Sequence, residues 1–342
     1  MKPLELALVG CGAIAQAGYL PALARVPEAR CLWLVDLRRP LAKRLARRWR
    51  IPHVATDLGA VLDRVEAVIL AVPNHLHAPM GLLALERGRA VLCEKPLGRT
   101  AAEVRGMVAA SRKAGAALAA GMIFRQYPGL QAIRGARVQD MLGRVREIRA
   151  RYGTPLDWPL MSPDFFAREQ AGGGALLDLG VHVLDALLWL FSPQGASVLE
   201  YEDDGESRVE AEARARLALR LVEAPEGVPC LLEVSRVRRL DNRIAVVGEN
   251  ASLLIPLSSA AAPSLVRNGA VGSLPVSASP PRTARDCFAE QIRAFARAFR
   301  GLEATVADGA SQIPVLELIE SCYAARKPLT FPWQAYAPWN QG

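Results

Sequence analysis

Histidine and cysteine are scarce in this chain, and neither occurs in a pattern that holds a metal or builds a disulfide framework. The only histidines are His53, His75, His77 and His182, and none stands in an H-E-x-x-H or similar ligand spacing. The six cysteines are scattered, with no C-x-x-C pair. We therefore expect no metal centre, and reduced thiols that are mostly buried as small hydrophobic side chains.

Long apolar runs are also missing. No stretch approaches the roughly 20 consecutive apolar residues that span a bilayer, and residues 4–9, LELALV, are typical of a strand rather than of a secretion signal. We expect a cytoplasmic protein that does not enter the membrane. With 342 residues, 51% hydrophobic and 22% charged, the chain is long enough for two globular domains.

The balance of charge is basic, with a formal net charge of +8. A nucleic-acid surface has to be considered because basic residues crowd one short segment, namely Arg38, Arg39, Lys43, Arg44, Arg47, Arg48 and Arg50. Trp49 is the only aromatic residue among them, whereas single-strand binding surfaces use several stacking platforms. We interpret this segment as a solvated helix face, and we expect no nucleic-acid partner.

Strand and helix patterns alternate over residues 1–121. Short apolar runs typical of buried parallel strands lie at 4–9, 31–35, 67–72 and 90–93, and helix-period segments lie between them at 12–24, 40–50 and 78–87. This alternation predicts βαβ units, so we expect a doubly wound α/β domain.

The pattern changes after residue 121, which predicts a second, α+β domain over 122–342. Helices are expected at 129–141, 175–191, 284–300 and 309–326, and strands at 145–152, 211–221, 228–237 and 243–247. The alternating strand segments predict antiparallel pairing with one covered face. Residues 258–281, rich in Ala, Ser, Gly and Pro, are expected to form a loop or a weak surface strand.

A glycine fingerprint follows the first predicted strand. Residues 10–15 read G-C-G-A-I-A, and this G-x-G-x-x-A opens the first predicted helix. Gly10 and Gly12 allow the backbone to approach a pyrophosphate, and the helix N-terminus favours its negative charge. Asp36 ends the next strand, where a carboxylate accepts hydrogen bonds from an adenosine ribose. Asp36 favours NAD over NADP, although Arg38 and Arg39 are close enough in sequence to pair with a 2′-phosphate.

Polar residues follow two further strands. Val72-Pro73-Asn74-His75 and Glu94-Lys95-Pro96 stand just beyond the carboxyl ends of buried runs, where ligands bind in such sheets. Lys95 is one of only five lysines. We therefore favour a functional role for it over that of an ordinary surface residue.

A second group of candidate residues lies on the predicted helix 175–191. Asp178 and His182 are four residues apart and share one helix face, and Asp185 extends that face by another turn. A single histidine on an apolar helix is usually a satisfied core residue, and an aspartate after glycines is usually a cap. The combination with Lys95 favours a site.

Together these motifs resemble the glucose-fructose oxidoreductase, inositol dehydrogenase and MocA superfamily, abbreviated Gfo/Idh/MocA. The resemblance extends over most of the chain and includes residues 10–15, the stretches 71–77 and 94–97, Phe124-Arg125, the helix from Asp178 to His182, and Asp308-Gly309. It implies a Rossmann domain followed by a domain built on a large, open, mostly antiparallel sheet, with nicotinamide and a sugar or polyol meeting between them. It also implies a homo-oligomer, a dimer or tetramer.

The resemblance also implies roles for individual residues. The catalytic group maps to Lys95, Asp178 and His182, and substrate contacts map to these three together with Arg125 and the loop of Asp157 and Trp158. The residues predicted to bind the cofactor, NAD or NADP, are Gly10, Gly12, Ala13, Ile14, Asp36, Arg38, Pro73, Asn74, His77, Glu94 and Lys95. The chain departs from many members in its first helix, where Gly18-Tyr19 stand in place of a histidine.

The charges of these groups predict a mechanism. His182 as a neutral imidazole would take the hydroxyl proton while a hydride leaves the carbinol carbon, and Lys95 as an ammonium would stabilise the alkoxide. Asp178 would hydrogen-bond the substrate and the surroundings of His182, and so hold both in line. We hypothesise a sugar or cyclitol dehydrogenase. The alternatives are a reductase of a dihydrodiol or tetrapyrrole, a non-catalytic nicotinamide sensor, and an enzyme that keeps its nicotinamide tightly bound and recycles it.

Overall fold

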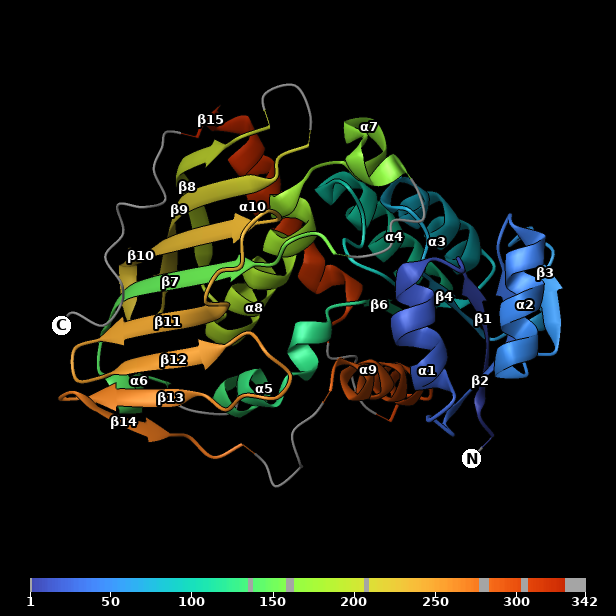
Figure 1. The fold of residues 1–342 in the computed structure, drawn as a ribbon, viewed down its shortest axis with the longest axis horizontal. Helices are drawn as coiled ribbons and strands as arrows, with labels where there is room; N and C mark the ends of the chain where they lie inside the picture. The colour runs from blue at the N-terminus through green and yellow to red at the C-terminus, as the bar shows by residue number, and fades with distance from the viewer. Residues whose placement is uncertain are drawn as a thin grey trace.

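The protein consists of two sheets with a layer of helices between them (Figure 1). The computed structural model describes residues 2–134, 138–157, 163–205, 209–276, 283–302 and 307–329. Trp158, residues 135–137 of the predicted helix 129–141, and the end of the segment 258–281 lie outside these ranges.

The first sheet is parallel and has six strands in the order β3-β2-β1-β4-β5-β6. These are β1 (Leu4–Val9), β2 (Ala29–Val35), β3 (His53–Ala55), β4 (Ala67–Leu70), β5 (Ala90–Cys93) and β6 (Leu118–Ala120). Every residue of β4 and β5 is buried, as their continuous apolar runs predict. The strand order reverses between β1 and β4, which is where doubly wound sheets bind ligands. The prediction of a doubly wound parallel sheet is confirmed.

Helices cover both faces of this sheet. They are a π-helical turn at Ala15–Tyr19 that continues into α1 (Leu20–Leu23), then α2 (Arg39–Trp49), α3 (His77–Glu86), α4 (Ala101–Ala114) and, from much later in the chain, α9 (Ala284–Phe299). Phe288, Ile292 and Phe295 of α9 pack into the same core as Leu4 and Leu6 of β1. The core of the first domain therefore includes residues from beyond the predicted boundary at 121.

The second sheet has nine strands in the order β14-β13-β12-β11-β7-β10-β9-β8-β15. These are β7 (Val145–Gly153), β8 (Gly195–Asp203), β9 (Glu212–Leu221), β10 (Ala224–Ser235), β11 (Arg243–Gly248), β12 (Ser252–Pro256), β13 (Ser264–Arg267), β14 (Ala270–Ser273) and β15 (Arg326–Pro328). Among the described strands of this second sheet, only β7 with β10 and β8 with β15 pair in parallel. The predicted open, mostly antiparallel sheet is confirmed.

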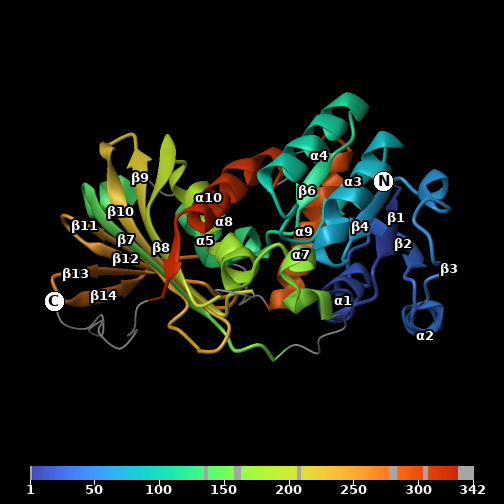
Figure 2. The same cartoon turned by 90° about the horizontal axis from the view of Figure 1, so that it is seen from above.

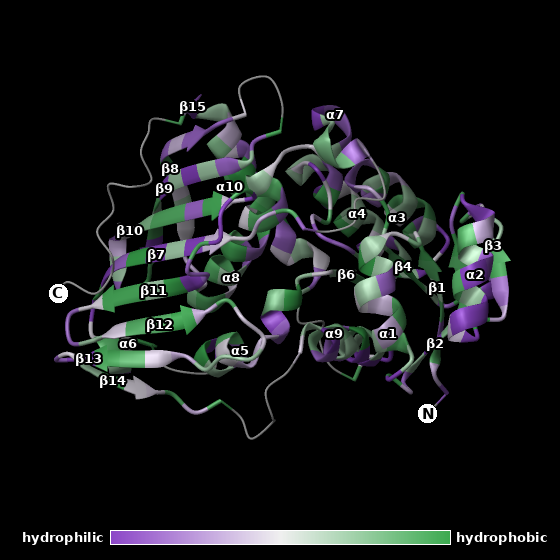
Figure 3. Cartoon of the chain, in the orientation of Figure 1, coloured by the Kyte–Doolittle hydropathy of each residue, from purple (hydrophilic) through white to green (hydrophobic). Residues whose placement is uncertain are grey.

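The helices of the second domain lie on one face of this sheet. They are α5 (Pro128–Arg134), α6 (Val138–Leu142), α8 (Val181–Phe191) and α10 (Ile313–Ala324), with the short α7 (Arg168–Ala171) near the first domain. Figure 2 shows α5, α8 and α10 between the two sheets, with no described helix over the other face. Buried and less buried residues alternate along β9, and Figure 3 shows the matching change of hydropathy along that strand.

The segment Arg168–Phe191 has the length and composition of a membrane span, with a mean hydropathy of 1.6 in its most apolar window. In this structure 78% of that window is buried inside the protein, so the segment has the surroundings of a core helix.

Candidate active site

The loop after β1 has the geometry that a dinucleotide phosphate needs. Gly10 has a φ of +92°, and a Cβ there would overlap the backbone oxygen of Ala71 at the end of β4, so only glycine fits. A Cβ on Gly12 would meet no atom within 4 Å, which leaves space beside the start of the helix. Ala13 and Ile14 form the first turn after that space. The described residues therefore fit a bound pyrophosphate.

Asp36 follows β2 and is held by its neighbours. Its Oδ2 accepts a hydrogen bond of 2.7 Å from the backbone N–H of Cys11, which ties it to the glycine loop. Its Oδ1 accepts hydrogen bonds from the backbone N–H and from Nε of Arg38, at 2.8 and 3.1 Å. Burial raises the pKa of Asp36, but the hydrogen bonds from Arg38 and Cys11 outweigh this and lower it below its usual value. Asp36 is therefore an ionised acceptor with an exposed guanidinium beside it.

The loop after β4 contacts the second domain. Asn74 Nδ2 donates a hydrogen bond of 2.8 Å to the backbone oxygen of Ala171, and Pro73 precedes it at the turn. His77 is buried, and its two ring nitrogens lie 2.7 Å from the oxygen of Pro96 and 2.8 Å from that of Val72. The two ring nitrogens thus face carbonyl oxygens of two different strand-end loops, and a neutral ring, which carries one N–H, donates to one of them. The contact of His77 with the cofactor stays a prediction.

Glu94 and Lys95 follow β5 and have different side-chain partners. Glu94 is buried, and its Oε1 accepts a hydrogen bond of 2.7 Å from the hydroxyl of Tyr19, which also accepts one of 3.3 Å from Gln291 on α9. Burial raises the pKa of Glu94, while Tyr19 and Lys95 oppose that shift. Tyr19 therefore provides Glu94 with a polar partner at the position where the chain departs from the Gfo/Idh/MocA pattern.

Lys95 reaches across to the second domain. Its Nζ donates hydrogen bonds to Asp178, at 2.5 Å to Oδ1 and 2.8 Å to the backbone oxygen. Burial and the positive charge of Arg236 lower the pKa of Lys95 to about 7, while Glu94 acts in the opposite direction. The Asp178 carboxylate in contact with Nζ also favours the charged form. The structure thus brings together two residues that are 83 positions apart and come from different domains.

His182 lies one turn further along the same helix. Asp178 belongs to a π-helical turn at Leu176–Gly180, and His182 is the second residue of α8. The imidazole is buried and stacks on Phe124, with ring centroids 4.6 Å apart. Burial and the charge of Lys95 lower the pKa of His182 well below its usual value, so the ring is neutral near pH 7. Its Nδ1 is buried and has no hydrogen-bond partner among the described residues.

Arg125 and Asp157, two of the residues predicted to contact substrate, differ in burial. Arg125 is buried, and its Nε and Nη2 donate hydrogen bonds of 2.9 and 2.6 Å to the two carboxylate oxygens of Asp185. Nη2 also lies 3.0 Å from the hydroxyl of Ser311. The guanidinium is thus engaged by the protein itself, and its contact with substrate stays a prediction. Asp157 is exposed at the end of the described part of its loop.

Arg236 is a site residue that the sequence analysis missed. It is the first residue after β10, and its guanidinium contacts Oδ2 of Asp178 on the side opposite to Lys95. The alternating pattern of 228–237 predicted only a strand, and no motif marks the position. The one available signal is its place directly after a buried strand end.

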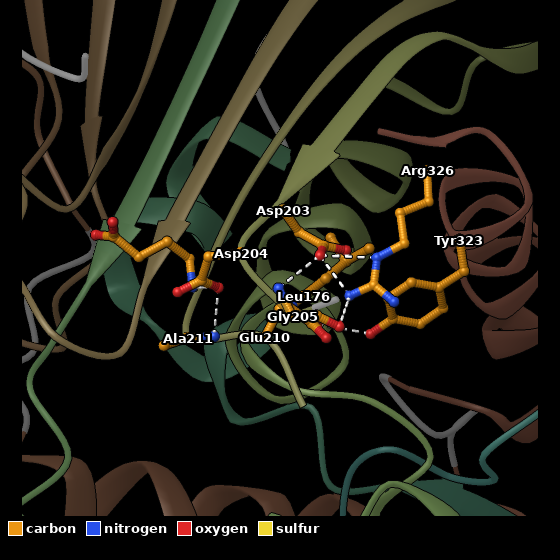
Figure 4. Close-up of polar contacts among 9 residues, drawn as sticks. Leu176, Asp203, Asp204, Gly205, Glu210, Ala211, Tyr323 and Arg326 are labelled. Carbon is orange, nitrogen blue, oxygen red and sulfur yellow. Dashed lines mark hydrogen bonds and ion pairs between the residues drawn. The ribbon is translucent and has the colours of Figure 1, made fainter. Parts of the chain in front are cut away.

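A polar cluster holds the start of the helix that carries Asp178 (Figure 4). Glu210 accepts hydrogen bonds from the backbone N–H of Leu176 at 3.0 Å and from the hydroxyl of Tyr323 at 2.8 Å. Its own backbone oxygen accepts a bond of 2.7 Å from Ala175. A Cβ on Gly174 would overlap the backbone of Glu210. The glycine run 172–174 therefore allows the helix start to lie against this cluster.

Gly174→Ala is expected to destabilise the protein by about 1–3 kcal/mol, because the added methyl group must push the helix start away from the Glu210 backbone. Urea unfolding measures this change. Gly106→Ala is the matched control: a Cβ at this position of α4 meets nothing within 4 Å, so the change is expected to be neutral or to stabilise by up to about 1 kcal/mol. Equal stabilities for the two variants would contradict the proposed role of the glycine run.

Two family models match the chain. An oxidoreductase family model with an NAD-binding Rossmann fold, Gfo/Idh/MocA, matches residues 4–122, and the Gfo/Idh/MocA C-terminal domain model matches residues 130–254. Together they cover most of the described chain, in the same order as the two sheets. The chain therefore belongs to the Gfo/Idh/MocA family of oxidoreductases.

Individual relatives include enzymes with different substrates. The trans-1,2-dihydrobenzene-1,2-diol dehydrogenase of Mus musculus is 34% identical over 195 residues, which are 56% of this chain and 57% of that protein. The dTDP-3,4-didehydro-2,6-dideoxy-alpha-D-glucose 3-reductase of Saccharopolyspora spinosa is 31% identical over 210 residues, 60% of this chain and 62% of that protein. The similarity thus spans about three-fifths of the length of these relatives.

A solved structure matches over nearly the whole chain. It is a mutant of KijD10, a 3-ketoreductase from Actinomadura kijaniata, in complex with TDP-benzene and NADP, with a TM-score of 0.83 at 25% identity. The match covers 96% of this chain and 100% of that one. The arrangement of the two sheets is therefore that of a solved member of this fold.

Proposed function

We propose that this protein is an oxidoreductase that transfers a hydride between NAD or NADP and a sugar, a cyclitol or a related secondary alcohol. One observation carries the proposal: Lys95, at the end of a strand in a dinucleotide-type sheet, is in contact with Asp178 of the second domain. His182 lies on the same helix as Asp178, close enough for the charge of Lys95 to lower its pKa.

The residues that would hold the cofactor are the glycine loop, Asp36 and the two strand-end loops that follow β4 and β5. A bound nicotinamide supplies the hydride acceptor or donor. Arg38 neutralises much of the charge of Asp36, so Asp36 repels a 2′-phosphate less than an unpaired carboxylate would. We therefore expect both NAD and NADP to bind, with NAD moderately preferred.

The polar groups of the site have complementary roles. His182, neutral near pH 7, accepts the proton of the substrate hydroxyl when an alcohol is oxidised. Lys95 as an ammonium stabilises the oxygen that loses the proton, and Asp178 holds Nζ in place. In the opposite direction the same groups deliver the proton to a ketone oxygen.

Reduction or oxidation of a non-sugar substrate is the second candidate. The Mus musculus relative, named as a dihydrobenzenediol dehydrogenase, supports it. A non-catalytic nicotinamide sensor has less support, because Lys95, Asp178 and His182 are all present, Lys95 contacts Asp178, and the charge of Lys95 acts on His182. We also propose a cytoplasmic protein that forms a homo-oligomer and has no nucleic-acid or membrane partner.

The test begins with thermal unfolding in the presence of NAD and of NADP. The preferred nucleotide is then used to follow the reduced-nicotinamide absorbance over a panel of polyols, aldoses, uronates, nucleotide sugars and trans-dihydrodiols. We expect a rise in the unfolding midpoint with either nucleotide, and turnover on at least one panel member. Nucleotide binding without any turnover would favour the sensor, and no binding of either nucleotide would overturn the proposal.

A further inference from the structure

Arg236 enters the site from the second sheet. Its side chain is 13% exposed, one guanidinium nitrogen contacts Oδ2 of Asp178, and the guanidinium carbon lies 5.9 Å from the centre of the Phe165 ring. The residue is thus enclosed between the helix that carries Asp178 and the loop before α7. A guanidinium in these surroundings has little water to screen its charge.

The Asp178 carboxylate is shared by two cations. Lys95 holds Oδ1 at 2.5 Å, and Arg236 holds Oδ2. A carboxylate that is already paired with one cation attracts the second less strongly, and the two cations repel each other. This repulsion affects mainly the protonation state of Lys95, because a lysine can release its proton under conditions in which an arginine stays charged.

We propose that Arg236 is a positioning residue of this site: by holding one oxygen of Asp178 it orients the carboxylate toward Lys95 and sets how much negative charge Lys95 experiences. Other charged or titratable groups interact with Lys95 from the segments packed around it. They are Glu94 beside it, Asp178, His77 on α3 and His182 on α8. Of these, Glu94 and Asp178 favour the charged form of Lys95.

The pKa values agree with this arrangement. Burial and the charge of Arg236 lower the pKa of Lys95 to about 7, and burial lowers the pKa of Arg236 to about 10. Removal of the guanidinium charge should therefore raise the pKa of Lys95. A group with a lowered pKa is charged only below that value, so the native Lys95 loses its proton as the pH rises through about 7.

The test is a pH titration of the ligand-free protein labelled with ¹³C-lysine and followed by NMR. The chain has five lysines, and the Lys95 signal is assigned from its absence in Lys95→Met. In the native protein we expect the midpoint of Lys95 near pH 7. In Arg236→Gln we expect it higher by about one pH unit or more, and in Arg236→Lys, which keeps the charge, close to the native value.

Arg239→Gln is the matched control, since it removes the same charge from an exposed residue three positions along the chain. It should leave the Lys95 midpoint unchanged. If Arg236→Gln does not fold, as judged by circular dichroism, Arg236→Met makes the same comparison. A Lys95 midpoint that is the same with and without the Arg236 charge would overturn the inference.

The kinetic consequence rests on the proposed function, whereas the titration does not. In the direction of reduction, activity should fall as Lys95 loses its proton, and in Arg236→Gln this fall should move to higher pH by the same amount as the NMR midpoint. A shifted midpoint without turnover on any substrate would leave the inference standing and count against the proposed function. A lower kcat with an unmoved pH profile would mean that Arg236 is merely structural.

Discussion

Replacement of Lys95 by methionine is expected to lower kcat roughly 10²–10⁴-fold, the range for loss of a group that stabilises charge or transfers a proton in the transition state. The substitution keeps an unbranched side chain that is one atom shorter and removes the ammonium that contacts Asp178. Asp178 keeps a positive partner in Arg236, so the variant is not left with an unpaired carboxylate. The measurement is steady-state turnover on a substrate from the panel, with the thermal response to the nucleotide as evidence that the site still binds it.

Lys113→Met is the control for this experiment, because Lys113 is exposed in the last turn of α4. It should turn over substrate at the native rate. Near-normal turnover of Lys95→Met would remove Lys95 from the mechanism and with it the proposed function. Loss of turnover together with loss of the nucleotide response would indicate that Lys95 acts in cofactor binding instead.

The first domain could be predicted well because its signals are local. The apolar runs of β1, β4 and β5 and the fingerprint at Gly10 and Gly12 occupy short continuous segments, and each has one dominant physical explanation. Helix α4, however, was not predicted. The short edge strands β3 and β6 were not predicted either, and neither were β8 and β12 in the second domain. Their stability comes from neighbouring strands far away in the chain, which a local pattern does not contain.

The site, too, was predicted in outline because its signals are local. The rule that ligands bind beyond the carboxyl ends of parallel strands identified the edge of the sheet at Asn74 and Lys95. It could not identify the direction of each side chain: His77 and Glu94 turn to partners within the protein, at Val72, Pro96 and Tyr19. Arg236 was missed because its contact with Asp178 joins residues 58 positions apart.

Arg125, for which a substrate contact was predicted, forms a buried ion pair with Asp185. The guanidinium makes two hydrogen bonds to the carboxylate, and Gln312 donates a further one of 2.8 Å to Oδ1 of Asp185. The exposed fractions of the two side chains are 5% and 0%. The pair joins the segment after β6 to the middle of α8, which also carries His182.

Asp185→Ala is therefore expected to destabilise the protein by about 3–5 kcal/mol, because it leaves the Arg125 guanidinium buried without its carboxylate. Urea unfolding followed by tryptophan fluorescence measures this, and Trp189 is a suitable reporter because the Arg125 guanidinium lies 5.6 Å from the centre of its ring.

Asp63→Ala is the matched control for Asp185→Ala. The Asp63 side chain is 73% exposed and its nearest cation is 3.6 Å away, so its loss should cost no more than about 1 kcal/mol. A stable Asp185→Ala protein with a raised KM would show instead that Arg125 is available to substrate, as the family resemblance implied. Strong destabilisation means that the pair serves to hold α8, and with it His182, at a fixed position relative to Lys95.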